Sequence, residues 1–144
     1  MKRFHFPLDR LRAWRQTQFE REEARLAALL AELEALRQHR GQLRAQEAAS
    51  LASIHASPVV NVAELQTLEA FRRWVRREEV RIKSEEAGLG ARIAEQRGAV
   101  VEARRKVEGL DRLKEKRLNA WRAEVDRQTE QAVAELVIAR WTSR

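Results

Sequence analysis

Histidines and neighbouring carboxylates are the side chains in this sequence that could do catalytic or metal chemistry. His5, His39 and His55 lie far apart along the chain, and none has a second ligand at helical spacing on its own face. Adjacent carboxylates such as Glu78 and Glu79 have arginines three or four positions away, which is typical of solvated helix faces. The sequence has no cysteine and no glycine-rich phosphate loop. We therefore expect no enzyme activity, no metal and no cofactor.

Positive charge and aromatic residues are the remaining features that could bind a partner. The formal net charge is +7, and basic residues gather at the amino end through Arg25, at 72–77 and at 104–117. Such charge fits nucleic acid, an anionic membrane surface or an acidic protein surface. Phe71 and Trp74 lie one helical turn apart among the arginines of the second cluster. They are either half-buried core residues or an exposed docking patch.

The composition predicts long helices rather than a compact domain. Charged residues make up 35% of the chain and aromatic residues 6%, and there are only two prolines, a composition typical of coiled coils. The absence of cysteine fits a cytosolic protein. No apolar run approaches the roughly 18 residues of a membrane span, and the amino end lacks the apolar core of a signal peptide. We expect a soluble, cytoplasmic protein.

An apolar residue returns every third or fourth position through most of the second half of the chain. Such a seven-residue repeat in one phase predicts a left-handed coiled coil, and a helix of this length would measure on the order of 120 Å. Glycines within it either soften the helix, allow close approach of a facing helix, or break it near Gly88 and Gly90. The predicted seam consists of Leu65, Leu68, Arg72, Val75, Glu79, Ile82, Glu86, Leu89, Ile93, Gln96, Val100, Ala103, Val107 and Leu110.

A second apolar stripe upstream supplies the partner for this seam. Pro58 interrupts the helical pattern after that stripe, and Asn61 with Glu64 reads as a capping box that opens the next helix. The stripe consists of Leu26, Leu29, Leu33, Leu36, Leu43 and Ile54. So short a connection makes the helices antiparallel neighbours. We predict an all-α fold, a long antiparallel two-helix coiled-coil hairpin with the second helix extending past the first, as a single domain over 1–144 with a helix at about 8–55, a turn at 56–61 and a helix at about 62–140.

The second helix is predicted to extend past the start of the first. If Ile54 faces Leu65, Leu8 lies opposite Asp111, and residues 112–140 have no helix beside them. An apolar stripe without a partner predicts protein binding or self-association. The apolar residues left without cover are Leu118, Trp121, Val125, Val133, Leu136, Val137, Ile138 and Trp141.

Two stretches of the sequence resemble the FliJ-type flagellar type III export proteins. The opening FHFPLDRLRAWRQTQFEREEARLAALLAELEAL is similar to the amino end of that family, and VVEARRKVEGLDRLKEKRLNAWRAEVDRQTEQ is similar to its carboxyl half. The likeness spans nearly the whole chain in order and length. The chain departs from the family near its end, where Ala134 and Glu135 replace an Asp-Glu pair and Trp141 replaces a smaller aromatic residue.

The resemblance implies a non-enzymatic component of the flagellar export apparatus. It implies a central stalk that inserts the open end of the hairpin into the hexameric export ATPase, touches the membrane-embedded export gate and in some relatives escorts substrate chaperones. The protein would be cytoplasmic and peripheral at the membrane-bound apparatus, without nucleic acid. For the gate, the resemblance points to Phe71 and Trp74. The ATPase-binding residues that it implies are Leu8, Leu11, Arg12, Arg15, Arg104, Arg105, Lys114, Arg117 and Trp121.

Three other functions stay open at this point. A homologous stalk of a virulence type III secretion system would differ only in its genomic neighbourhood. A basic hairpin that binds nucleic acid is a further possibility, although glutamates scattered among the basic residues count against it. A structural coiled coil would self-associate through the uncovered end of the second helix.

Overall fold

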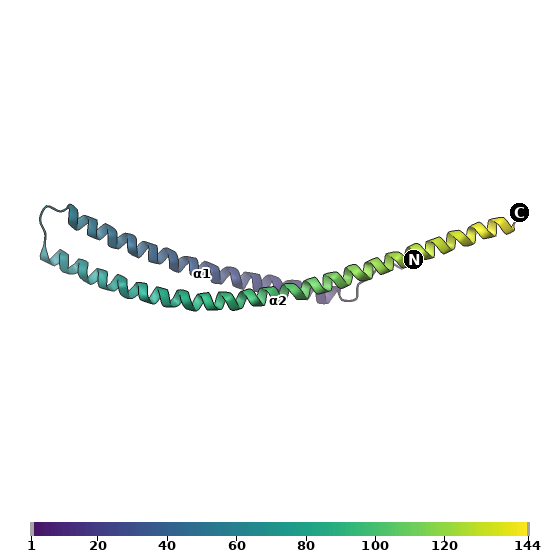
Figure 1. Ribbon diagram of the computed structural model, residues 1–144, viewed down its shortest axis with the longest axis horizontal. Coiled ribbons are helices and arrows are strands. Elements are labelled where there is room, and N and C mark those ends of the chain that lie inside the picture. The colour runs from purple at the N-terminus through teal and green to yellow at the C-terminus, as the bar shows by residue number, and fades with distance from the viewer. Residues whose placement is uncertain (1, 144) are drawn as a thin grey trace. The chain divides into compact units, whose positions relative to one another are not determined.

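The computed structural model describes residues 2–143, and these residues form two helices joined by a turn (Figure 1). Helix α1 spans Asp9–Ala56 and helix α2 spans Val62–Thr142. The fold is all-α, an antiparallel two-helix coiled-coil hairpin with the second helix extending past the first, and the predicted fold class is confirmed. No helix within residues 2–143 is long and apolar enough to cross a membrane.

The chain divides into two compact units. The turn unit comprises Arg21–Val100 and contains the turn between the helices. The terminal unit comprises Met1–Glu20 and Val101–Arg144, and so joins the beginning of α1 to the last part of α2. The single-domain assignment stays a prediction.

Local sequence explains where both helices begin. Pro7 precedes α1, and the first helical hydrogen bond runs from Arg12 N to Leu8 O at 2.8 Å. The side chain of Asn61 caps α2, since its Oδ1 accepts a hydrogen bond from Ala63 N at 2.9 Å. The predicted return bond from Glu64 to Asn61 is not among the hydrogen bonds of residues 2–143, so only half of the capping box forms.

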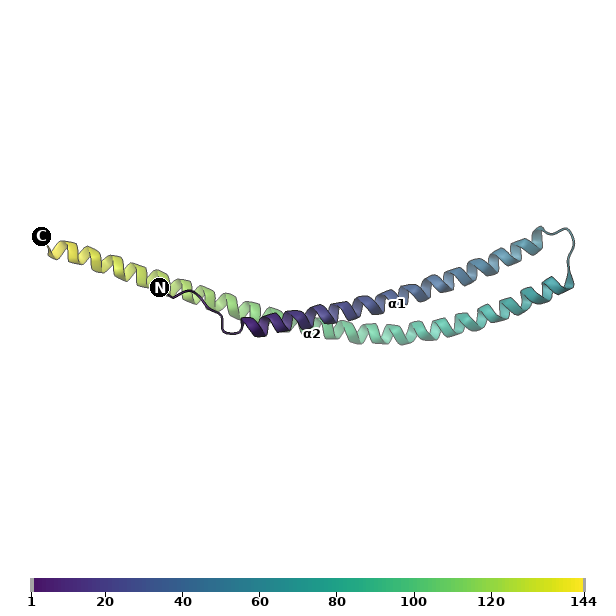
Figure 2. The same ribbon diagram turned by 180° about the vertical axis from the view of Figure 1, so that it is seen from behind.

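Figure 2 shows α1 and α2 running side by side from the turn, and the core of the turn unit lies along the predicted seam between them. Val75 and Ile82 are fully buried and pack with Leu43 of α1, which is 2% exposed. Burying an aliphatic side chain of this size contributes about 2 kcal/mol, so this row pairs the two helices. The buried residues of α2 within this unit are Leu68, Val75, Ile82, Leu89, Ile93 and Val100.

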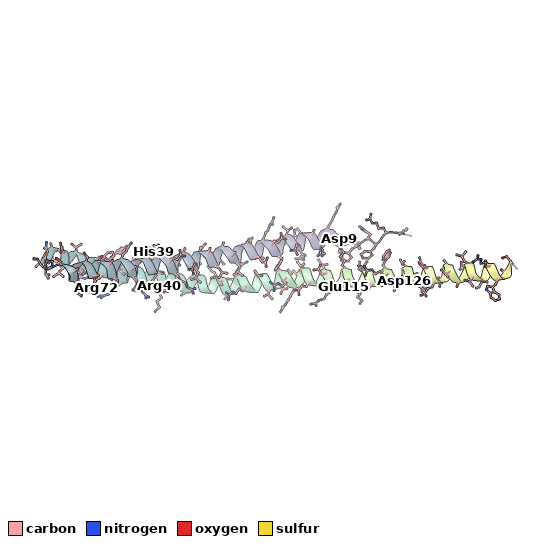
Figure 3. The ribbon with its side chains drawn as sticks, turned by 90° about the horizontal axis from the view of Figure 1, so that it is seen from above. Asp9, His39, Arg40, Arg72, Glu115 and Asp126 are labelled. Carbon is pink, nitrogen blue, oxygen red and sulfur yellow. The ribbon has the colours of Figure 1, made fainter. Side chains whose placement is uncertain are left out.

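The charged positions of the same seam meet partners of opposite sign on α1. Arg72 Nε lies 3.1 Å from Glu47 Oε1, and Arg44 Nε lies 2.8 Å from Glu79 Oε1. A slip of one heptad would bring Arg72 against Arg40 instead of Glu47. Because like charges repel, this pattern specifies the register of the hairpin. Figure 3 labels Arg72, one of these seam residues, on α2.

Helix α2 runs without interruption through its glycines. A Cβ built on Gly88 or Gly90 meets nothing within 4 Å, and none of the glycines has a positive φ. Close approach of the facing helix is therefore not the reason for glycine here, and the alternative of a break near Gly88 and Gly90 is wrong. Each glycine costs about 1 kcal/mol of helix propensity relative to alanine.

Candidate partner-binding surface of the terminal unit

Two ion pairs fasten the start of α1 to α2 in the terminal unit. Arg12 pairs with Asp111, and Lys114 Nζ lies 2.9 Å from Asp9 Oδ1. Leu8, which was expected opposite Asp111, is half-buried one helical turn away from Arg12.

The coil before α1 packs its two phenylalanines onto α2. Phe6 is 2% exposed, and the cations of Lys114 and Arg117 lie 5.9 and 5.7 Å from the centre of its ring. The rings of Phe4 and Trp121 lie 5.8 Å apart. The chain thus supplies an apolar partner as far as Trp121, and the prediction that Leu118 and Trp121 lack one is wrong.

Extended geometry explains why so few residues cover so much of α2. An extended chain advances about 3.3 Å per residue and a helix about 1.5 Å, so the step from Phe6 to Phe4 matches the step from Arg117 to Trp121. Beyond Trp121 every described residue of α2 except the half-buried Val125 is exposed, and Figure 3 shows Asp126 on a part of the helix with no other helix beside it. The aromatic-x-aromatic opening before Pro7 was the signal in the sequence that pointed to this contact.

Several of the predicted ATPase-binding residues serve contacts inside the terminal unit. Arg12, Lys114, Arg117 and Trp121 hold the amino end on α2, as described above. The guanidinium of Arg104 lies 5.5 Å from the ring centre of Phe19.

Of the other predicted residues, Leu11 and Arg105 are exposed and Arg15 is half-buried. Leu11 is 40% exposed, and Arg15 lies 4.7 Å from the ring centre of Trp14, which is itself 51% exposed. Arg105 makes only a long ion pair of 3.8 Å with Glu102 on its own helix. A partner can therefore reach these side chains without displacing α1 from α2.

Residues 122–142, which we call the uncovered stretch, expose a broad apolar surface. At about 100° per residue, the apolar side chains from Val133 to Trp141 span roughly 200° of the helix circumference. One partner helix covers an apolar stripe only about 100° wide. The exposed apolar residues are Val133 at 54%, Leu136 at 70%, Val137 at 51%, Ile138 at 62% and Trp141 at 81%.

Charged pairs on its own surface support this stretch as a helix. Arg127 Nη2 lies 2.8 Å from Glu124 Oε1, and Gln128 Nε2 donates to the same oxygen at 2.9 Å. The hydrogen bond from Arg127 is the main reason that the pKa of Glu124 is lowered from its ordinary value. The same pair raises the pKa of Arg127.

Phe71 and Trp74, the predicted gate-binding pair, lie in the turn unit. Their rings stack with centres 5.9 Å apart. Phe71 is half-buried and packs against the Val75 and Ile82 core, whereas Trp74 is 41% exposed. The expected half-buried core position is thus that of Phe71, and the expected exposed position is that of Trp74.

The fold and its surfaces define the class of protein, an all-α two-helix coiled coil whose second helix continues beyond its internal partner. No group of three metal-ligating side chains comes together within residues 2–143. The family model described as "Flagellar FliJ protein" matches residues 4–144. The chain therefore belongs to the FliJ family, whose members are non-catalytic components of the flagellar type III protein export apparatus. No curated protein and no solved structure matches the chain.

Proposed function

We propose that this protein is the central stalk of the hexameric export ATPase and that the uncovered stretch enters the pore of the hexamer. The observation that carries the proposal is the width of the apolar surface between Val133 and Trp141. A ring encloses a helix from several sides, so it can bury an arc of about 200°, which a single partner helix cannot. Family membership supports the same setting, since FliJ proteins belong to the export apparatus.

Residues beside the start of α1, on both helices of the terminal unit, would extend this contact to the rim of the pore. Leu11 and Arg105 are exposed in the terminal unit, and Arg15 beside them in the proposal is half-buried. Arg12, Lys114, Arg117 and Trp121 have a different role in the proposal, because they fix the amino end on α2 and so set where the uncovered stretch begins. Arg104, which lies against Phe19 of α1, and the half-buried Leu8 belong with this second group.

The turn unit would contact the export gate through Trp74. Arg76 and Arg77 follow Trp74 closely, and neither makes an ion pair within residues 2–143. An exposed tryptophan beside free arginines has the composition of an interface hot spot. Through this contact the protein would lie peripherally at the membrane, and substrate chaperones are further candidate partners in the same role of adaptor.

Stimulation of the export ATPase tests the stalk role. The double variant Val137→Ser and Ile138→Ser removes two exposed apolar side chains that point about 100° apart. We expect the stimulation of ATP hydrolysis to fall about tenfold or more, which corresponds to roughly 1.4 kcal/mol of lost binding free energy. Val80→Ser is the matched control, because Val80 is 71% exposed but lies in the turn unit.

Equal stimulation by the double variant and the control would contradict insertion of the uncovered stretch. Charge reversal of Lys114 and Arg117 is also expected to lower stimulation. Those side chains cover Phe6, however, so the reversal changes the fold of the amino end as well as any contact with the ATPase. The apolar variants are for this reason the sharper test.

A further inference from the structure

A groove of about 850 Å³ lies between α1 and α2 beside the turn. We call it the turn groove. Small and hydroxyl-bearing side chains line its α1 side, among them Ser50 and Ser53, whereas Thr67, Leu68 and Phe71 line its α2 side. All of these residues belong to the turn unit.

The turn groove exists because the apolar seam of α1 is interrupted. The steps of three and four residues that lead through Leu36 and Leu43 continue to Ser50, where a leucine would fill the space between the helices. Leu65, the seam residue of α2 nearest the turn, is consequently 40% exposed, whereas Val75 further along is 0% exposed. The two helices therefore leave apolar surface at this end that they do not cover themselves.

The charge around the turn groove differs from that of the rest of the chain. The chain has 29 lysines and arginines, yet residues 45–71 contain none. Glu47 and Glu69 pair with Arg72 and Arg73. Glu64 lines the groove and makes no ion pair within residues 2–143. The groove thus combines uncovered apolar surface with one free carboxylate.

We propose that the turn groove binds an amphipathic helix of a protein partner, with an apolar face toward Leu68 and Phe71 and a lysine or arginine that pairs with Glu64. The α2 side of the groove runs from Ala63 to Phe71, about 13 Å, which accommodates two to three turns of a helix. Such a helix anchors through apolar residues at spacings of three, four and seven. A basic residue on its flank matches the negative charge of the groove.

A membrane is the alternative occupant of this end of the turn unit, because the turn exposes Val59, Val60 and Val62 at 74, 61 and 67%. Stable binding to an anionic bilayer requires basic residues near the inserted side chains. Residues 45–71 lack them and place Glu64 there instead. The charge therefore favours a basic helix over a lipid surface.

Binding of a helical peptide to the full-length chain tests the proposal. The probe is a fluorescent peptide of about 14 residues with leucines on one face and lysines on its flanks, and its twin has glutamates in place of the lysines. We expect the lysine peptide to bind about tenfold more tightly than its twin in fluorescence anisotropy, and Glu64→Lys to reverse the order. Absence of binding, or equal binding of both peptides, would overturn the proposal.

A variant that fills the groove separates docking from unfolding. Ser50→Leu restores the apolar seam, so we expect a higher melting temperature together with about tenfold weaker binding of the lysine peptide. Ser84→Leu, on the exposed surface of α2, is the control and should leave peptide binding unchanged. Equal peptide binding by the two variants would contradict docking in the groove.

Vesicles of phosphatidylglycerol and phosphatidylethanolamine decide between the two occupants. We expect the full-length chain not to sediment with them at physiological salt. Sedimentation that Val60→Ser abolishes and Ser50→Leu leaves intact would assign this end to the membrane and overturn the proposal. The outcome is independent of the stalk role, because that role depends on the terminal unit and this one on the turn unit.

Discussion

Two stretches of α2 present their apolar residues differently. In residues 68–100 a narrow stripe of apolar side chains is at most 9% exposed, and charged residues in that stripe meet opposite charges on α1, whereas Trp74 and Val80 lie outside the stripe. In residues 133–141 the apolar side chains spread over a broad arc and are 51% exposed or more. A narrow stripe is the pattern of a helix with one helical partner, and a broad arc is the pattern of a helix enclosed from several sides.

The largest expected effect concerns one isoleucine from each stretch. Ile82→Ala removes a fully buried side chain and should lower the free energy of unfolding by about 2–4 kcal/mol. Ile138→Ala removes a side chain that is 62% exposed and should change that free energy by less than about 0.5 kcal/mol. Chemical denaturation monitored by circular dichroism measures both. A similar loss for the two variants would show that residue 138 has an internal partner after all.

Phe6 sets the boundary between the covered and uncovered parts of α2. Because Phe6 is 2% exposed, Phe6→Ala should release the amino-terminal coil at a cost of about 2 kcal/mol, the free energy of burying such a side chain. Amide hydrogen exchange of residues 112–121 should become faster. His5→Ala, at the neighbouring exposed position, is the control. Unchanged exchange in the Phe6 variant would contradict the cover described for this segment.

A smaller effect is expected from two charged pairs, one between α1 and the seam of α2 and one in the uncovered stretch. Arg40→Ala leaves Glu86, whose side chain is 17% exposed, without its partner, and should cost about 1–2 kcal/mol. Glu86 Oε1 has no hydrogen-bond partner in any case, so Arg40 is its main support. Replacing both residues by leucine should recover the loss in thermal melts. Arg127→Ala, in the exposed pair with Glu124, should change the free energy of unfolding little. An equal loss of stability in the two arginine variants would contradict the difference between the half-buried and the exposed pair.

The smallest expected effect is a pH dependence of the helix in the uncovered stretch. The pKa of Glu124 is lowered from 4.5 in the helix, so the stabilisation from its pair with Arg127 is complete above that pH and is lost as the pH falls through the lowered pKa. Carbon chemical shifts of residues 124–128 should lose helical character over this acid range. Glu124→Gln should show no such change, and an acid transition that persists in this variant would assign the effect to another group.

The sequence predicted the covered part of the molecule well because a heptad repeat is a strong signal. Every buried residue of α2 lies at a predicted seam position, including Leu68, Val75 and Ile82. The same repeat placed Arg72 and Glu79 on the seam. The register in which Ile54 faces Leu65 places Glu47 opposite Arg72, where the ion pair forms, but it gives Arg40 for Glu79, which pairs with Arg44 instead.

The parts that the sequence did not predict lack periodicity. Phe4 and Phe6 cover α2 from an extended coil, where no repeat marks the face that is buried, and the apolar partner of Trp121 was missed for that reason. The turn groove follows from Ser50, a small residue at a seam position, and small residues do not by themselves reveal whether two helices close over them.

Hydrogen exchange of the full-length protein bound to the hexameric export ATPase tests the stalk role most directly. We predict that amides throughout residues 122–142 exchange more slowly in the complex than in the free protein, while the well-packed residues 75–100 show little change. Protection along the whole uncovered stretch is the expected signature of a helix enclosed by a ring. Unchanged exchange in residues 122–142, with protection elsewhere in the chain, would contradict insertion of this stretch into the ATPase.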